Sequence, residues 1–403
     1  MKRSGSADLP LHYGYVPGWL SERMATLGLA IAESVIAEYG KNELLRRLSD
    51  PFWFQSLGAV MGMDWHSSGI TTSVLGALKR AINPHAKELG IFICGGKGKF
   101  SKEAPRELLL VAERTGLDGQ NLVRCSKLSA KVDNTAVQDG FQLYTHNFIV
   151  SDSGEWTVVQ QGMRTGDKTA RRYHWHSENM TSFVDEPHSA VCGINQGKIL
   201  NLTAHDASLT RETMLTITHQ KPELMLQEIQ QLVLPSHHDV RSEDVDLKRL
   251  GSVLWLAHDN RPENFEELLL LQGVGPRTLQ SLTLVSEVIH GTPSRFKDPA
   301  RFAFAHGGKD GHPFPVPLKV YDETISTLQT AVQKSKMGET DKQEAIRALS
   351  QIAQRTEENF TPVNNFGALL EKEISESWKY DGRTVLGKSQ PKRKSKGVQL
   401  RLF

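Results

Sequence analysis

Hydrophobic and polar positions follow helical spacing over most of the first 130 residues. Residues 17–40 carry apolar side chains every three or four positions and end at Gly40, which predicts an amphipathic helix. The same spacing predicts further helices over 42–49, 71–81, 103–115 and 120–132. The continuous apolar run Ile91–Cys94 is short and predicts a buried strand.

The middle of the chain changes to a pattern typical of strands. Residues 141–150 and 155–162 are rich in aromatic and β-branched side chains, and the turn-forming stretch 151–154 lies between them, which predicts a β-hairpin. Further strands are expected over 170–202, and helical spacing returns over 209–234, 245–290, 320–336 and 341–357. The predicted fold class is α/β (α+β): an N-terminal body with a central sheet, followed by an all-α domain.

The most informative short motif lies within the helical region, where residues 266–279 read EELLLLQGVGPRTL. Glycines let the backbone turn sharply, and Pro276 suits the first position of a helix. The free amides at that helix start form an anion site, next to the cation Arg277. The motif resembles the helix-hairpin-helix element of DNA repair, replication and recombination proteins. The resemblance implies that DNA phosphates are held, without reading of bases, by a set of hairpin residues: Gly273, Val274, Gly275, Arg277 and Thr278. An ordinary tight turn between two helices is the alternative.

The last residues form a second recognisable motif. Gln399, Leu400, Leu402 and Phe403 resemble the Gln-Leu-x-Leu-Phe peptide by which bacterial repair proteins and polymerases bind the sliding clamp. Arg401 departs from that family, which usually has Ser or Asp there. The basic stretch 388–397 lacks apolar side chains and is expected to be a flexible tether. A sliding clamp is therefore an expected partner, and a basic tail with an apolar end of no function is the alternative.

The chain is expected to comprise an α/β putative catalytic body (1–205), a helical helix-hairpin-helix DNA-binding domain (206–360), a weakly patterned connector (361–386) and a disordered basic tail with the clamp-binding peptide (387–403). The chain has 403 residues, with 48 Lys and Arg and 46 Asp and Glu. Six of the basic residues lie in 388–403, so the rest of the chain has 42 basic and 46 acidic residues and a net charge of −4. Any DNA contact must therefore be a local patch. Three separated cysteines indicate reduced thiols, and no leader or apolar run of eighteen residues occurs. We expect a cytoplasmic, nucleoid-associated protein without a membrane partner, and the oligomeric state stays open.

Most of the chain also resembles an uncharacterised prokaryotic family, domain of unknown function 763. The matching stretches include Leu48–Gln55, Asp64–Gly69, Trp156–Met163 and Phe304–Pro313. Such a family implies no activity, so function has to be argued from the residues.

Polar residues gather around the predicted hairpin in positions that a core would not favour. Asp133 and Asp139 precede its first strand and Gln160 ends its second, while His174 and His176 are two apart and would share a strand face. Carboxylates with imidazoles suit Mg²⁺ or Mn²⁺, which orients an attacking water at a phosphate. We therefore expect Asp133, Asp139, Gln160 and His174 to be catalytic, with Asp133, Asp139, His174 and His176 binding the metal. The order of elements is loosely similar to restriction-endonuclease-like nucleases, but the Glu-x-Lys of that family is missing. Ordinary hydrogen-bonded strand residues are the alternative.

Three lysines are candidates for further phosphate contacts. Lys97 and Lys99 follow the short strand in a glycine-rich loop, and Lys309 lies in the glycine-rich stretch 306–312. Glycines allow the backbone to approach a phosphate closely. The first loop lacks the spacing of a nucleotide-binding P-loop, so DNA phosphate is the expected ligand.

Three functions remain open from sequence alone. The leading hypothesis is a metal-dependent DNA nuclease of repair or replication that is tethered to the clamp. A helix-hairpin-helix DNA glycosylase is the second, because Asp298 follows the hairpin at the place where such enzymes carry a catalytic Asp. Arg277 occupies the region of a lyase lysine and argues against Schiff-base chemistry. A non-enzymatic DNA-bound adaptor is the third.

Overall fold

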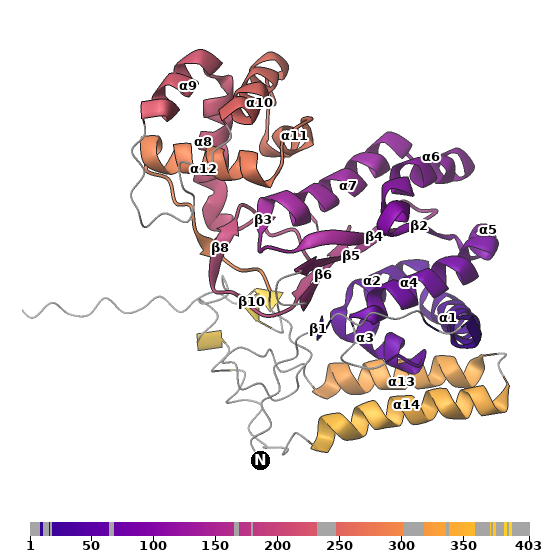
Figure 1. Cartoon of the computed structure of the whole chain (residues 1–403). Coiled ribbons are helices and arrows are strands. Elements are labelled where there is room, and N and C mark those ends of the chain that lie inside the picture. Colours follow the sequence, from indigo (N-terminus) through magenta and orange to yellow (C-terminus); the bar gives the residue numbers. More distant parts are fainter. Residues whose placement is uncertain are drawn as a thin grey trace, which may run out of the picture.

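The computed structural model of the chain describes most residues between 18 and 358 (Figure 1). The described ranges are 9–10, 16, 18–63, 68–164, 169–178, 180–231, 247–300, 318–335 and 338–358, with 371, 374–375, 383–384 and 387–388 near the end. Lys309 and the predicted clamp peptide at 399–403 lie outside these residues.

A mixed sheet–helix body forms the centre of the molecule. Its antiparallel sheet has the order β1-β6-β5-β4-β2, and β7 also pairs with β6. The strands are β1 (Leu9–Pro10), β2 (Ile91–Lys97), β4 (Gln142–Ser151), β5 (Trp156–Arg164), β6 (Thr169–His176) and β7 (Ala190–Cys192). The predicted hairpin is β4–β5, with Val150 opposite Trp156 across the turn. The α/β class predicted from sequence is confirmed.

Four helices, α1–α4, lie on one face of this sheet, and two more, α13 and α14, pack behind α1 and α3. They are α1 (Gly18–Tyr39), α2 (Lys41–Ser49), α3 (Pro51–Val60), α4 (Gly69–Ile82), α13 (Leu318–Lys334) and α14 (Glu339–Glu358). Ile93, Ile149 and Val159 of the sheet share a hydrophobic core with these helices. Helices α13 and α14 pack on α1 and α3, although the predicted 206–360 domain placed them with the hairpin helices. The predicted 206–360 unit is thus distributed over two separate packing regions.

The opposite face of the sheet is covered by α6 (Ala104–Thr115) and α7 (Gly119–Lys131). Phe148, Val158 and Trp175 point to this side and share a second core with Leu108 of α6 and Leu128 of α7. The short elements between α4 and α6 are η1 (Asn83–His85), α5 (Ala86–Leu89) and η2 (Gly98–Glu103). The body is therefore a sheet between two helical layers.

Five more helices extend this second core beyond α7. They are α8 (Ser208–His219), α9 (Pro222–Gln231), α10 (Leu247–Asn260), α11 (Phe265–Leu270) and α12 (Pro276–His290), and they cluster away from α13 and α14 in Figure 1. A small sheet of β3 (Val137–Gln138), β8 (Lys198–Asn201) and β9 (Phe296–Lys297) links them to the body. Strands β10 (Arg383–Thr384) and β11 (Gly387–Lys388) form a separate pair. No helix in the described ranges is both long and apolar enough to span a membrane.

Candidate functional site

Successive side chains of β6 point to opposite faces of the sheet, and most of them are polar. Arg171, Tyr173 and Trp175 face the α7 side, where the two aromatic residues belong to the second core. Arg172, His174 and His176 face the α2–α4 side. His174 and His176 thus share a face, as their spacing predicts. Three clusters of buried polar side chains, which are described next, are built on β6 or on the elements beside it.

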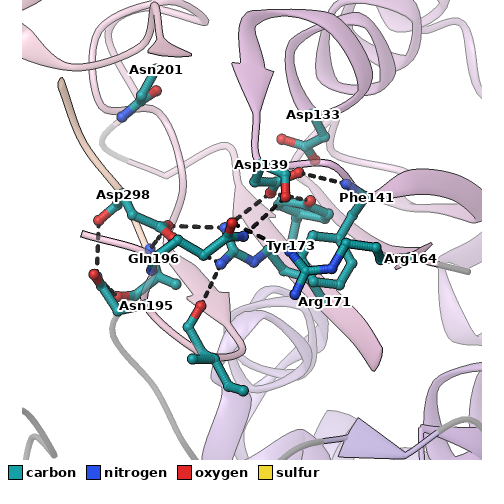
Figure 2. Close-up of polar contacts among 12 residues, drawn as sticks. Asp133, Asp139, Phe141, Arg164, Arg171, Tyr173, Asn195, Gln196, Asn201 and Asp298 are labelled. Atoms are coloured by element: carbon teal, nitrogen blue, oxygen red, sulfur yellow. Dashed lines mark hydrogen bonds and ion pairs between the residues drawn. The ribbon is translucent and has the colours of Figure 1, made fainter. Parts of the chain in front are cut away.

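The first cluster, which we call the arginine clamp, consists of Arg171, Asp139, Asp298 and Tyr173 (Figure 2). The guanidinium of Arg171 donates from Nη1 to Asp139 Oδ2 at 3.0 Å and to Asp298 Oδ1 at 2.9 Å, and from Nη2 to Asp298 Oδ2 at 2.8 Å. Tyr173 donates its hydroxyl to Asp139 Oδ2 at 2.6 Å. Burial raises the pKa of Asp139, although the adjacent Arg171 charge opposes that rise. The clamp joins β6 to the loops that flank β3 and β9.

Backbone amides occupy the remaining carboxylate positions of the clamp. Asp298 accepts from the amides of Gln196 (2.7 Å) and Ala300 (2.9 Å), and Asp139 accepts from that of Phe141 (3.0 Å). With all these acceptors in use, both carboxylates have a structural role, and neither lies on the cleft described below. Asp298, the candidate glycosylase residue, thus anchors the loop that follows β9 in this structure.

The second cluster is centred on Asp133, which lies in a π-helical turn, η3 (Val132–Ala136), directly after α7. Asp133 Oδ2 accepts from Gln160 Nε2 at 2.5 Å and from Trp175 Nε1 at 2.9 Å. Its other oxygen, Oδ1, is 2.5 Å from Nε2 of His188. Burial raises the pKa of Asp133, while His188 and the hydrogen-bond donors favour its charged form. The structure therefore brings the predicted residues Asp133 and Gln160 together.

The network behind Asp133 continues into the sheet. Gln160 Oε1 lies 2.7 Å from His146 Nδ1, and His146 Nε2 lies 2.8 Å from Ser126 Oγ of α7. Burial lowers the pKa of His146 to about 4, although the bond to Gln160 opposes the shift. His146 is therefore neutral at physiological pH. Gln160, His146 and Ser126 form a hydrogen-bonded floor beneath Asp133.

The third cluster lies on the other face of the sheet and is closed to solvent. Arg172 donates from Nε to His174 Nε2 at 2.8 Å and from Nη2 to Gln55 Oε1 at 2.9 Å. Since Nε2 accepts, the proton of His174 is on Nδ1, which donates to the Leu48 carbonyl at 3.3 Å. Burial, with help from Arg172, lowers the pKa of His174 well below its ordinary value. The structure does not bring His174 together with Asp133 or Asp139, because the sheet separates them.

A cleft of about 770 Å³ opens at the end of β6, between α2 and the loop that follows β6. Its lining includes His176, Glu178, Asp185, His188 and His205. The Asp133–His188 pair therefore connects the buried network to this opening. Within the described ranges no group of three or more His, Cys, Asp or Glu residues is arranged to hold a metal ion. The expected metal residues are thus separated: Asp133 lies behind the cleft, His176 lies on it, and Asp139 and His174 lie elsewhere.

His188 was not among the residues singled out from sequence. It lies in an irregular loop before β7, 55 positions after Asp133, and its neighbours show no strand or helix spacing. One local signal is Glu186, a non-glycine residue with φ of 47°, two positions before it. Such strained backbone concentrates at functional sites, but it is visible only in the structure.

The predicted DNA-contacting turn lies between α11 and α12. Gly273 has φ of 87°, Val274 is buried, and Gly275 precedes Pro276 at the start of α12. The amides of Arg277 and Thr278 have no partner within the helix, and no hydrogen bond to them is made by the described residues. The Arg277 side chain is exposed, whereas Thr278 is buried.

Two contacts fix this turn to the body. Lys131 at the end of α7 donates to the Val274 carbonyl at 2.6 Å, and Gln138 donates to the Pro276 carbonyl at 2.9 Å. Burial lowers the pKa of Lys131. The turn is therefore held against the segment that also carries Asp133.

A further contact joins α11 to the wall of the cleft. Glu266 accepts from Arg124 Nη2 at 2.6 Å and from the amide of Phe183 at 3.1 Å. Phe183 lies in the loop that leads to His188, and its ring stacks on Trp156 of β5. Lys97 and Lys99, in contrast, are exposed at the end of β2, the opposite edge strand of the sheet.

A family model described as "Protein of unknown function (DUF763)" matches residues 5–316, and the chain belongs to that family. The match spans the sheet, α1–α12 and the cleft. No curated protein and no solved structure matches the chain. The family confirms the resemblance seen in the sequence and assigns no chemistry.

Proposed function

We propose that the protein binds DNA through the α11–α12 turn and hydrolyses a phosphodiester bond in the adjacent cleft. The observation that carries this proposal is the double contact of Glu266, which ties α11 both to α7 and to the loop before His188. A phosphate-binding turn and a cleft with a candidate base thereby belong to one framework. The helix-hairpin-helix resemblance of residues 266–279 agrees with it.

The turn has the properties needed to hold a DNA backbone. Free amides at the start of α12 and the positive end of the helix dipole attract a phosphate, and the exposed Arg277 adds a full charge. Lys131 and Gln138 fix the turn through carbonyl groups, so its amides remain available. Contacts of this kind position DNA of any sequence and make binding dependent on salt.

The Asp133–His188 pair suits activation of water. Trp175, Gln160 and the buried network fix the carboxylate, which accepts from Nε2 of His188 and leaves Nδ1 without a hydrogen bond to the described residues. In the proposed reaction Nδ1 takes a proton from a water as its oxygen attacks phosphorus. The P–O bond to the leaving strand breaks, and that oxygen takes the electron pair and a proton from solvent. A bound Mg²⁺ or Mn²⁺ would stabilise charge on the phosphate.

DNA binding is tested with Arg277→Ala and with Arg114→Ala as its control, an identical charge change at an exposed position of α6. Loss of one phosphate contact should weaken binding of duplex DNA several-fold and reduce the slope of log K against log salt by about 1. The control should leave both quantities unchanged. Equal effects of the two variants, or none in either, would contradict a phosphate site at this turn.

Hydrolysis is tested on an end-labelled panel of single-stranded, duplex, flapped and base-damaged DNA, with EDTA, Mg²⁺ or Mn²⁺. His188→Gln should reduce strand cleavage by about 10²-fold or more, the usual contribution of a general base. His85→Gln, on an exposed side chain, serves as the control. Undiminished cleavage by His188→Gln would remove the catalytic role. An absence of strand breaks, even after alkali treatment, would leave the DNA-bound adaptor as the better account.

The sliding clamp remains a proposed partner on the strength of the sequence alone, because residues 399–403 lie outside the described part. Deletion of Gln399–Phe403 should abolish clamp pull-down while DNA binding stays intact. Retained pull-down by the shortened chain would exclude this peptide as the clamp contact.

A further inference from the structure

The cleft at the end of β6 is rich in acidic side chains. Glu178, Asp185, Glu186 and Asp206 line it, and Arg46 is the one arginine among the described residues of the lining. Arg46 donates to Glu43 Oε1 and Oε2 at 2.6 Å, so its charge is already paired. A phosphate would be repelled from such a wall unless a cation were bound there.

His176 supplies an independent sign of a ligand on this wall. Its Nδ1 lies 2.9 Å from Thr157 Oγ1 and 3.2 Å from the Trp156 carbonyl. Thr157 itself donates to the Leu45 carbonyl at 2.8 Å, so Nδ1 of His176 carries the proton and Nε2 presents a lone pair. His176 is only 8 % exposed, and its Nε2 has no hydrogen-bond partner among the residues that the structure describes. A buried acceptor without a hydrogen bond lowers the stability of the fold unless a ligand binds it.

The carboxylate of Glu178 lies close to this lone pair. Its Oε2 lies 3.4 Å from Nε2 of His176, a separation without a hydrogen bond. Two neighbouring ligands of an octahedral ion with bonds of about 2.1 Å are about 3.0 Å apart. The two atoms therefore need to move by only a few tenths of an ångström to share one cation.

We propose that a divalent transition-metal cation, with Mn²⁺ as its probe, binds between His176 Nε2 and Glu178 Oε2. Imidazole is a ligand of transition metals, and carboxylate and water are ligands that suit Mn²⁺. The remaining positions are filled by water and, during the proposed reaction, by a DNA phosphate. This inference rests on the proposed function for its role, since the cation would hold the phosphate in the cleft that His188 also lines. The ligand pair itself stands on geometry alone.

The test is the binding of Mn²⁺ alone to the full-length protein without DNA, measured by loss of the free-ion EPR signal and by calorimetry. Wild-type protein should bind one Mn²⁺ per chain at this site, and His176→Gln or Glu178→Gln should weaken that binding at least tenfold. The matched control is the exposed pair His85 and Glu88, whose Nδ1 and Oε2 lie 3.8 Å apart. His85→Gln and Glu88→Gln should leave Mn²⁺ binding unchanged.

Two outcomes would overturn the site: no Mn²⁺ bound by the wild type at millimolar concentration, or Mn²⁺ binding by both cleft variants that is as strong as that of the wild type. Glu178 is about half exposed, so Glu178→Gln should fold even where His176→Gln does not, which a circular dichroism melt establishes. The result also separates this inference from the proposed function. Mn²⁺ binding without DNA cleavage would refute the proposed hydrolase activity but support the cation site. DNA cleavage in the presence of EDTA would support the hydrolase activity and show that it does not need this cation.

Discussion

The arginine clamp and the Asp133–His188 pair are both built around buried carboxylates on the same face of the sheet. They differ in whether a hydrogen-bonding group of the cluster remains available to a ligand. In the clamp, Arg171, Tyr173 and backbone amides occupy the carboxylate oxygens of Asp139 and Asp298. In the pair, the carboxylate is equally occupied, but it holds an imidazole whose second nitrogen is free of hydrogen bonds to described residues. The clamp is closed, whereas the pair opens onto a cleft.

This difference separates structural from chemical use of the same residue type. A carboxylate whose acceptors are all matched within the fold contributes stability and has no capacity for a substrate. A carboxylate that orients an imidazole toward a cleft leaves that imidazole able to take a proton. Substitutions in the clamp should therefore act mainly on stability, and substitutions in the pair mainly on activity.

The largest effect on stability is expected from Arg171→Met. This change leaves Asp139 and Asp298 buried without their shared cation, and breaking a buried ion pair in this way costs about 3–5 kcal/mol. Urea unfolding monitored by tryptophan fluorescence measures the loss of free energy.

The control for Arg171→Met is Arg164→Met on the neighbouring strand β5. Arg164 lies over the Phe141 ring at 4.9 Å and is not fully buried. Its replacement should cost about 1 kcal/mol or less, as for other half-exposed contacts. A similar small loss for Arg171→Met would mean that the clamp does not stabilise the fold.

The second prediction concerns the floor beneath Asp133 and its dependence on pH. The pKa of His146 is lowered from 6.5 to about 4 in the folded protein, so the unfolded chain takes up a proton more readily. The stability due to neutral His146 is therefore present above pH 6.5 and is lost as pH falls toward 4. At pH 5 the wild type should have lost roughly 2 kcal/mol more than His146→Gln, relative to pH 7.5.

Urea midpoints of the two proteins at pH 7.5, 6 and 5 check this difference. The comparison between the two proteins removes the contributions of other groups, including His174, whose pKa is also lowered, and Asp133 and Asp139, whose pKa values are raised. Parallel pH profiles for wild type and His146→Gln would show that His146 titrates normally in the fold.

The local elements of this fold follow from sequence patterns, because those patterns act over a few neighbouring residues. The helices at 18–39 and 104–115 and the β4–β5 hairpin agree with the apolar spacing that predicts them. The common face of His174 and His176 follows in the same way, since a strand alternates sides. Each of these features is determined by spacing alone.

Features that depend on residues distant in sequence were beyond these patterns. Asp133 and His174 look like members of one cluster, but the sheet lies between them, because alternation on β6 is fixed relative to α7 only by packing. His188 is joined to Asp133 across 55 positions through an irregular loop. Helices α13 and α14 have ordinary amphipathic patterns that do not specify α1 and α3 as their partners.

Among the variants of the two carboxylate clusters and their floor, the smallest effect on stability is expected from His188→Gln, the variant with the largest expected effect on cleavage. The new amide can donate to Asp133 Oδ1, and Trp175 and Gln160 still donate to Oδ2, so the carboxylate keeps its partners. The loss should be about 1 kcal/mol, comparable to one ordinary hydrogen bond. Urea unfolding under the conditions used for Arg171→Met measures it. A loss as large as that of Arg171→Met would show that the Asp133–His188 pair has the same structural role as the arginine clamp. The contrast between a closed cluster and one that opens onto a cleft would then no longer identify the catalytic carboxylate.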